Sequence, residues 1–600
     1  MEGEPHCRKP LLRKEIVMAK QSVEEIKKES RGLRGKIVET INSGASHFED
    51  AEYQLMKFHG SYQQDDRDLR KERRKQKLDK AWSFMIRSKM PGGRLTAEQY
   101  IAHDNIADSV GCGNMRLTTR QGIQLHGVLI GDLQTVVKTV VASGLTTSGA
   151  CGDVVRNTMG PASPIKDAVH EDCQNLAEEI TQTFLATTKA YYDIWLDGEK
   201  LPMTEGEPSD DPEDPIYGKD YLPRKFKIGI AVPPRNDVDI FSNDIGMVPH
   251  VVDGKVAGYS IWVGGGFGMT HGMEATRPHL AKPLAYAERG DVMEVVKAVI
   301  QVQKANGNRE NRKLARLKHV IMEKGIEWFL GEVKKLVGEG LALEDVKEVT
   351  FETVGDMLGW HEQGDGNSFR GIHVPQGRVE DIENGAQYKT AFRLLSEKHG
   401  LSSIVTPNCN LVFSDISEDQ KSVVDKILAD HKIPGGEQFS VMKQMAHACV
   451  SLPTCGLGLA ESERVLGGLL DSVDDILNDF DLEDEQLLIR MTGCPNGCAR
   501  PYNADFGFVG RGPQKYAMYV GGSHRGDRLA GLYKKVVMFD DIPAEMREIL
   551  EDFAKNREAD ETFTDFWGRT RKPGEEPDSS HFHVEFEERA VAKAAAAAAE

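Results

Sequence analysis

Two short strings of cysteines stand out in this chain: His447-Ala-Cys-Val-Ser-Leu-Pro-Thr-Cys455 and Thr492-Gly-Cys-Pro-Asn-Gly-Cys-Ala-Arg500. Their pattern is C-x5-C, then a gap of 38 residues, then C-x3-C. The four thiols belong to Cys449, Cys455, Cys494 and Cys498. Four thiolates in two close pairs indicate a metal site, and their spacing limits the choice of metal.

Three interpretations of these cysteines are open from the residues alone. They are buried thiols that cluster by chance, since free cysteine packs as a small hydrophobe. Alternatively they form a structural zinc site, whose usual C-x2-4-C spacing fits the second pair better than the first. The third interpretation is an iron–sulfur cluster, which suits wider and unequal spacings. Gly493 and Gly497 favour a cluster, because glycine lets backbone N–H groups approach inorganic sulfide.

Both strings, with the residues between the cysteines, resemble those of the sirohaem-dependent sulfite and nitrite reductases, and the resemblance runs from about residue 50 to about residue 570. It implies that the four cysteines hold a [4Fe–4S] cluster and that Cys498 also binds the sirohaem iron. It further implies an α+β (mixed α/β) fold of two pseudo-symmetric halves. Each half has a ferredoxin-like half-domain and a sirohaem-facing α/β domain.

The sequence pattern agrees with a repeated α+β fold. Strand patterns at 226–232 and 260–263 and a helical pattern at 292–302 indicate mixed secondary structure. A weak internal repeat lays 117–127 on 405–415, which matches Ile123 with Leu411. One departure from the family is visible, because Cys409 stands where the family usually has glutamine.

These features predict six segments along the chain. They are an N-terminal extension (1–50, partly helical from about Val23 to Asn42), a first ferredoxin-like half-domain with an N-terminal wrap (51–150), a first sirohaem-binding domain (151–340), a second ferredoxin-like half-domain (341–425), a second sirohaem and [4Fe–4S] domain (426–575) and a C-terminal tail (576–600).

Composition excludes several classes of protein. The chain has 600 residues, enough for several domains, and contains no apolar run long enough to predict a membrane span. Its N-terminus has no apolar signal-peptide region, and nine cysteines is an odd number. We therefore expect a cytoplasmic protein with reduced thiols, and a plastid stroma is also compatible. The formal charge of −19 argues against a nucleic-acid partner.

Four basic residues lie in strings that match the family's substrate-binding motifs: Arg87, Arg156, Lys225 and Lys227. Lys225 and Lys227 are two residues apart, so a strand would point both ammoniums to one face, where they repel unless an anion lies between them. The alternative is an ordinary exposed amphipathic strand. A reductase of oxyanions needs such cations, because they bind the anion and supply protons.

A second set of residues resembles the family's sirohaem cradle. Sirohaem carries eight carboxylates, so a basic cradle is expected. The even spacing of Arg116, Arg120 and Gln124 predicts one strand with all three on the same face. The cradle candidates are Arg116, Arg120, Gln124, His126, Arg309, Arg312 and Lys313. The alternatives are a structural histidine at His126 and a charged helix start at 309–313.

The resemblance implies an assimilatory sulfite reductase that reduces sulfite to sulfide with six electrons. Its rivals are a nitrite reductase on the same scaffold and a non-catalytic structural zinc protein. The chain shows no nucleotide-binding fingerprint, so its electrons must come from a partner. We expect ferredoxin in preference to a flavoprotein. The basic run at 67–80 is either a solvated helix face or a docking strip for an acidic donor.

Overall fold

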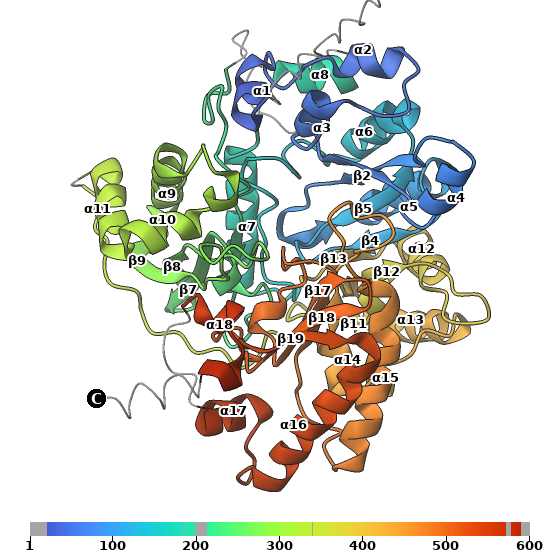
Figure 1. Cartoon of the computed structure of the whole chain (residues 1–600), viewed down its shortest axis with the longest axis vertical. Helices are drawn as coiled ribbons and strands as arrows, with labels where there is room; N and C mark the ends of the chain where they lie inside the picture. Colours follow the sequence, from blue (N-terminus) through green and yellow to red (C-terminus); the bar gives the residue numbers. More distant parts are fainter. Residues whose placement is uncertain (1–20, 187, 198–212, 339, 572–577, 590–600) are drawn as a thin grey trace, which may run out of the picture.

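Four β-sheets with flanking helices make up the fold of the computed structural model (Figure 1). The structure describes residues 21–186, 188–197, 213–338, 340–571 and 578–589. Sheets and helices mix throughout this part of the chain, so the predicted α+β class is confirmed. No helix in the described ranges is both long and apolar enough to cross a membrane.

The first and second sheets have the same antiparallel order and exchange one short strand. The first contains, in spatial order, β1 (Ser61–Asp65), β2 (Trp82–Arg87), β5 (Ile123–Val128), β4 (Met115–Leu117) and β12 (Arg378–Val379). The second contains β10 (Gly359–Glu362), β11 (Ser368–Ile372), β14 (Leu411–Ile416), β13 (Ser402–Val405) and β3 (Arg94–Leu95). Strands β3 and β12 therefore each complete the sheet of the other half, so neither sheet is continuous in sequence.

The internal repeat corresponds to the central hairpins of these two sheets. In the first, Leu117 pairs with Ile123, and in the second Val405 pairs with Leu411. The helices repeat as well: α5 (Ala97–Ser109) and α6 (Leu133–Ala142) correspond to α12 (Tyr388–His399) and α13 (Glu418–Asp430). The pseudo-two-fold architecture predicted from the sequence is thus present in strand register as well as in order.

The other two sheets also repeat one another. The first-half sheet runs β6 (Ile228–Ile230), β7 (Ile245–Val252), β8 (Lys255–Val263) and β9 (Lys282–Glu288). The second-half sheet runs β15 (His447–Ala448), β16 (Ile489–Thr492), β17 (Phe506–Gly512), β18 (Lys515–Val520) and β19 (Gly531–Met538). In both, a parallel pair (β6 with β7, β16 with β17) is followed by two antiparallel strands.

Amphipathic helices cover these two sheets. The first-half sheet is flanked by α7 (Ala168–Thr183), α9 (Val292–Asn306), α10 (Leu317–Lys324) and α11 (Ile326–Val337), whereas α8 (Lys189–Trp195) packs against α6. The second-half sheet is flanked by α14 (Val441–Met445), α15 (Glu463–Asp479), α16 (Ile542–Asn556) and α17 (Phe563–Arg571). In α15, Leu466, Leu469, Leu470 and Val473 repeat at helical spacing and are buried, which fixes the face that packs on the core.

The two ends of the described chain pack against the body. The expected helical stretch in the N-terminal extension is α1 (Val23–Glu29) and α2 (Ile37–Asn42), followed by α3 (Asp50–Met56). Residues 1–20 and 590–600 lie outside the described part. Within the predicted C-terminal tail, α18 (Ser580–His583) buries Phe582 completely, and its carbonyl accepts a 3.2 Å hydrogen bond from Tyr519 Oη. Residues 578–589 therefore belong to the folded body, because an aromatic side chain anchors them.

A buried ionic cluster joins the two halves. Asp239 Oδ2 lies 3.0 Å from Arg490 NH1 and 3.0 Å from Arg500 Nε. Asn503 Nδ2 donates to the same carboxylate at 3.0 Å. Asp239 and Arg490 are 0% exposed, so the carboxylate is the main compensation for two desolvated guanidiniums.

Replacing Asp239 with alanine should destabilise the protein by about 3–5 kcal/mol, because two buried guanidiniums lose their carboxylate. The matched control is Asp430→Ala, which breaks an exposed 2.7 Å pair with Lys426 on α13 and should change stability by less than about 1 kcal/mol. Urea unfolding of the purified variants measures both. Equal losses in the two variants would contradict this account of the cluster.

Candidate cluster and anion site

The two cysteine loops leave the same edge of one sheet. Strands β15 and β16 are parallel neighbours, with Ala448 opposite Met491. Cys449 follows β15 directly, and Cys494 comes two residues after β16. Parallel strands end at a common edge of the sheet, so the two cysteine loops begin at adjacent positions although they are far apart in sequence. The N–H of Gly493 donates to Cys449 Sγ at 3.4 Å, which links the two loops.

Glycines allow these loops to pack so closely. A Cβ on Gly493 would lie 1.8 Å from Ser451 Oγ and 2.5 Å from the Ala460 carbonyl oxygen. Gly497 has φ +62° and a Cβ there would meet the Tyr502 ring at 2.9 Å. The C-x3-C turn therefore requires glycine at 497. Glycine is required at 493 because Ser451 and Ala460 of the other cysteine loop pack directly against it.

The donor set fits an iron–sulfur cluster. All four cysteines are free thiols. Burial, followed by the charge of Cys498, raises the pKa of Cys494 to about 12. Four neighbouring cysteines become thiolates together only where a bound cation compensates their charge. Across the described residues, no three His, Cys, Asp or Glu side chains are grouped closely enough to hold a single metal ion.

Side chains of the first sheet hold the strand that leads to Cys449. Arg116 NH2 donates to the Ala448 carbonyl at 2.8 Å, and the Ala448 N–H donates to Gln376 Oε1 at 2.9 Å. The Glu463 carboxylate on α15 forms ion pairs with Arg116 Nε at 3.0 Å and with Arg378 Nε at 2.7 Å. Arg116, expected in the sirohaem cradle, thus lies in an ion-pair network beside a cluster cysteine.

The expectation that Arg116, Arg120 and Gln124 share one strand is wrong. Arg116 on β4 lies directly opposite Gln124 on β5, and Arg120 lies in the turn between them. The turn at 118–122, where Gln121 has φ +48°, folds the even-spaced run into a hairpin. Cross-strand pairing still places Arg116 and Gln124 side by side, with Arg87 the next partner of Gln124 on β2.

Near this face Arg120 is half-buried and His126 is buried. Arg120 donates to the carbonyls of Asn157 at 2.9 Å and Ile228 at 3.3 Å, and also to Asn243. Burial lowers the pKa of Arg120 to about 9, with Arg156 adding repulsion. Burial and then Arg378 lower the pKa of His126 to about 3, so its ring is neutral at pH 7. A neutral imidazole there hydrogen-bonds but carries no charge for an anion.

The run at 309–313 is largely engaged in ion pairs. Arg309 NH1 lies 2.6 Å from Glu24 of α1. Arg312 holds both oxygens of Asp153, at 2.7 and 2.8 Å. Lys313 is exposed. Arg309 and Arg312 tie the N-terminal helix and the 149–156 loop to the first-half domain. The cradle role of all three residues stays a prediction.

Lys225 and Lys227 lie where the cluster loops and the basic residues meet. Between and beside them Phe226 and Ile228 are buried, so the two lysines alternate onto the opposite face, as their spacing predicts. No described residue accepts a hydrogen bond from either ammonium. Burial, followed by Arg224, lowers the pKa of Lys225 to about 7, while Cys498 opposes this shift. Burial, Arg120 and Lys225 lower that of Lys227 further, again opposed by Cys498.

The loop at 149–156 holds the two arginines of the predicted anion site. Arg156 donates its Nε–H to the Gly152 carbonyl at 2.8 Å and NH1 to the Ala150 carbonyl at 3.3 Å. Arg87 NH1 donates to Cys151 Sγ at 3.4 Å, and its Nε is buried with no described partner. Arg156 also acts electrostatically on Lys225 and Arg120. Electrostatic contact thus links Arg156 to Lys225, and no described carboxylate forms an ion pair with the ammonium of either lysine.

Sequence inspection missed several charged residues of this region. Arg316 forms a two-pronged pair with the buried Asp244, at 3.1 and 2.8 Å, and Lys318 donates to the Gly268 carbonyl at 2.7 Å. Asp244 also accepts the Lys227 N–H at 2.8 Å. The signal that could have revealed them is the Arg-x-Lys spacing of 316 and 318, just after the 309–313 run.

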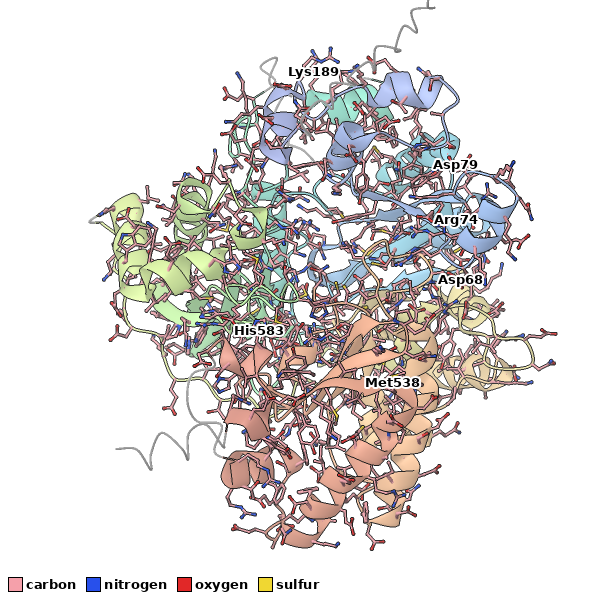
Figure 2. All side chains as sticks on the ribbon, in the orientation of Figure 1. Asp68, Arg74, Asp79, Lys189, Met538 and His583 are labelled. Atoms are coloured by element: carbon pink, nitrogen blue, oxygen red, sulfur yellow. The ribbon has the colours of Figure 1, made fainter. Side chains whose placement is uncertain are left out.

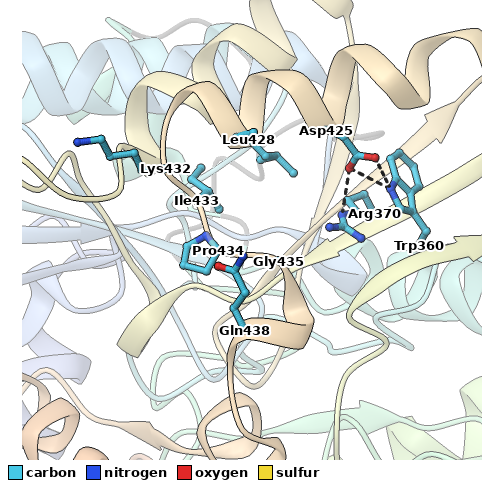
Figure 3. A pocket seen from close by; sticks show the side chains of 10 residues that line it. Trp360, Arg370, Asp425, Leu428, Lys432, Ile433, Pro434, Gly435 and Gln438 are labelled. Atoms are coloured by element: carbon cyan, nitrogen blue, oxygen red, sulfur yellow. Dashed lines mark hydrogen bonds and ion pairs between the residues drawn. The ribbon is translucent and has the colours of Figure 1, made fainter.

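A separate surface pocket of about 770 Å³ lies in the second half-domain, beside α13 (Figure 3). Trp360 donates its Nε1–H to Asp425 at 3.0 Å, and the Arg370 guanidinium lies 5.4 Å from the Trp360 ring centre. The lining residues are Trp360, Arg370, Asp425, Leu428, Ala429, Lys432, Ile433, Pro434, Gly435 and Gln438. None of the predicted site residues is among them, so this pocket is distinct from the cluster and anion site.

Comparison with known proteins identifies the family. Residues 152–341 match the family described as nitrite and sulphite reductase 4Fe-4S domain, and residues 77–143 match the nitrite/sulfite reductase ferredoxin-like half domain. The chain is 44% identical over 564 residues to the sulfite reductase (NADPH) hemoprotein beta-component of Staphylococcus saprophyticus, covering 94% of this chain and 97% of that one. The protein of the same name from Geobacillus kaustophilus is 43% identical over 564 residues, with the same two coverages, 94% and 97%.

A solved structure shares the fold. The NirA protein of Mycobacterium tuberculosis superposes with a TM-score of 0.72 at 23% identity, covering 92% of this chain and 96% of that one. The relatives at 44% and 43% identity over most of both chains show that the chain belongs to the nitrite and sulphite reductase family, and the predictions of this family and of its two cofactors, sirohaem and a [4Fe–4S] cluster, are confirmed. The matched 4Fe-4S domain contains Lys225 and Lys227, whereas the four cysteines lie in the second copy of the same sheet order.

Replacing Cys494 with serine should remove most iron and acid-labile sulfide from the purified protein, because a buried hydroxyl does not replace a thiolate ligand. Cys112→Ser is the matched control, since Cys112 is an exposed thiol outside both loops. Iron and sulfide analysis with an absorption spectrum measures the result. Normal iron and sulfide in the Cys494 variant would exclude it as a cluster ligand.

Proposed function

We propose that this protein is the haemoprotein of an assimilatory sulfite reductase. The reaction is SO₃²⁻ + 6 e⁻ + 6 H⁺ → S²⁻ + 3 H₂O, so the site must bind a dianion and deliver protons. The observation that carries the proposal is the convergence of Lys225 and Lys227 with Cys498, which are about 270 residues apart in sequence. The names of the relatives support the same reaction.

The cysteine loops supply the proposed cluster ligands. Cys449, Cys455, Cys494 and Cys498 would hold the [4Fe–4S] cluster, and Cys498 would also bind the sirohaem iron. When bound, these two cofactors carry and transfer the electrons. Cys498 is the exposed member of the four, so it is the thiol best able to face a second group.

The basic residues bind and orient the substrate in this proposal. Arg87, Arg156, Lys225 and Lys227 contact the oxygens of sulfite. The lowered pKa of Lys225, about 7, lets this ammonium release a proton near neutral pH and regain it from water. Arg120, Arg116, Gln124 and His126 are proposed to face the sirohaem. Arg309, Arg312 and Lys313 are proposed to bind sirohaem carboxylates as well. Arg309 and Arg312 would then bind these carboxylates in addition to Glu24 and Asp153, their present partners.

Nitrite is the alternative substrate on the same scaffold. The discriminating assay measures kcat/KM for sulfite and for nitrite with reduced methyl viologen as an artificial electron donor. We expect a higher kcat/KM for sulfite, because a set of cations favours the more highly charged oxyanion. The protein should also be coloured, with haem-type absorption bands. A higher kcat/KM for nitrite would overturn the choice of substrate, and a colourless protein would overturn the enzyme proposal.

We also propose that the electrons come from a separate NADPH-linked protein. The relatives are named as NADPH-type beta-components, which gives no support to the ferredoxin expected from the sequence. The surface next to the cluster loops suits an acidic carrier. Arg67 donates to the carbonyls of Cys455 at 3.1 Å and Gly458 at 2.5 Å, and the helix that follows it, α4 (Arg70–Lys75), is exposed.

This surface lies at one edge of the molecule. Arg74 of α4 projects outward between Asp68 and Asp79 (Figure 2). Leu69 and Leu457, from the α4 segment and the cluster loop, are both exposed apolar side chains. Exposed leucines within a basic rim are typical of a transient electron-transfer interface, where charge guides encounter and apolar contact holds it.

Reversing three exposed charges, Lys71→Glu with Arg74→Glu and Lys75→Glu, should raise the KM for the reduced donor about tenfold at low salt, because electrostatic steering is lost. The matched control reverses Lys334 and Lys335 on α11, at the opposite side of the molecule (Figure 1). Turnover with methyl viologen should not change in either variant. Unchanged donor KM in the α4 variant would exclude this surface, and comparing an NADPH-linked donor with ferredoxin identifies the class of donor.

A further inference from the structure

Lys89 is a buried cation that the proposed mechanism does not yet use. It follows β2 and forms a bridge with Thr146, whose carbonyl accepts the Lys89 N–H at 2.8 Å. Arg87 and Lys89 are two residues apart in extended backbone, so their side chains share a face. Ser88, between them, contacts His103 of α5 at 2.8 Å on the other face. Lys89 therefore points away from the helix layer, on the same side as Arg87.

The ammonium of Lys89 has no partner among the described residues. Lys89 is 1% exposed, and its Nζ makes no hydrogen bond there. Burying an unpaired charge is costly, so structural lysines in protein interiors are normally paired. Lys27 in this protein shows the usual arrangement: it is 2% exposed, and its Nζ lies 2.5 Å from Glu24 and 3.1 Å from the Leu222 carbonyl.

The surroundings of Lys89 are those of the proposed anion site. A Cβ on Gly149 would lie 3.4 Å from the Lys89 Nζ, so the ammonium rests against the 149–156 loop. The same loop holds Arg156 through two carbonyls and contacts Arg87 through Cys151. Burial, followed by the charge of Arg156, lowers the pKa of Lys89 to about 7. No acidic group offsets this repulsion.

We propose that Lys89 is a fifth cation of the anion site and binds an oxygen of the oxyanion substrate beside Arg87 and Arg156. The inference rests on the proposed function, and it explains why an unpaired lysine is kept in the interior. A bound anion supplies the missing counter-charge. The same chemistry would suit a cofactor carboxylate, but the shared loop with Arg87 and Arg156 favours the substrate.

The test compares Lys89→Met with Lys27→Met, and adds Lys89→Arg. Lys89→Met should raise the KM for sulfite about 10- to 100-fold, the usual effect of losing one charged hydrogen bond, with normal iron, sulfide and haem absorption. Its Tm without sulfite should rise, because an unpaired buried charge is removed. Lys27→Met should lower Tm and leave KM unchanged, since Lys27 is paired. Lys89→Arg should recover most of the sulfite affinity.

The gain in Tm has a defined pH dependence. The pKa of Lys89 is about 7 in the folded protein and 10.5 ordinarily, so the ammonium destabilises the fold fully below pH 7. The gain from Lys89→Met should therefore be largest below pH 7 and decline as the pH rises towards 10.5. A purely structural role for Lys89 would give the opposite sign, a loss of Tm.

Three results would overturn the proposal: an unchanged KM in Lys89→Met, a lowered Tm, or loss of haem absorption, which would assign Lys89 to the cofactor. If the wild-type protein reduces no sulfite, the proposed function fails, and Lys89 loses its proposed ligand with it. A raised Tm together with an unchanged KM would reject Lys89 alone and leave the sulfite reductase proposal standing.

Discussion

Three buried aspartates determine which cations of this protein remain free. Asp153 holds Arg312, Asp239 holds Arg490 and Arg500, and Asp244 holds Arg316. Each carboxylate fixes guanidiniums that would otherwise repel one another in a desolvated interior. Among the described residues, the cations of the proposed anion site that form no ion pair with a carboxylate are Arg87, Arg156 and the lysines at 89, 225 and 227. Lys225 and Lys227 thereby present unpaired positive charge beside Cys498.

The pseudo-symmetry explains how one of these ion pairs arose at the join between the halves. Asp239 and Arg500 precede equivalent short helical turns, η3 (Ile240–Ser242) and η7 (Pro501–Asn503), and both have left-handed backbones, with φ of +52° and +57°. Residues at matching positions of two copies meet near the axis that relates them. Two charged residues that meet there must have opposite charges, and the first half supplies Asp239 while the second supplies Arg500. One copy then carries the lysines and the other the cysteines.

The sequence allowed prediction of those features that depend on local pattern or on motif. The internal repeat, the mixed α and β content and the alternation at 225–227 follow from short-range sequence patterns. The exchange of β3 and β12 does not, because two-residue strands have no periodicity, and their pairing depends on the other half. The hairpin at 115–128 is not predicted, because even spacing of polar residues arises in a single strand and also across a turn. The ion pairs of Arg309 and Arg312 depend on Glu24 and Asp153, which lie more than 150 residues away.

Cys409 shows how the second half compensates for a departure from the family. Its counterpart Gln121 bonds the Gly92 carbonyl at 3.1 Å and the Gly160 N–H at 3.0 Å, which ties a loop to its neighbour. A thiol is too short for this, and in the second half Gln376, in the loop itself, receives the Ala448 N–H instead. In the second half, therefore, the hydrogen bond between the two loops is made by Gln376 and not by residue 409. It is donated by Ala448, the residue before Cys449, so the cluster loop is still held although the side chain beside Arg116 is small.

The unbalanced lysines also bear on the choice of substrate. Burial is the main cause of the lowered pKa values of these lysines, and repulsion by neighbouring cations adds to it: Arg156 acts on Lys89, Arg224 on Lys225, and Arg120 on Lys227. A ligand that binds only the folded state returns this energy as stability and affinity. Sulfite offers two negative charges and three oxygens, whereas nitrite offers one charge and two oxygens. At equal distance a dianion gains twice the Coulomb energy of a monoanion, so each additional unpaired cation in the site widens the preference for the proposed substrate.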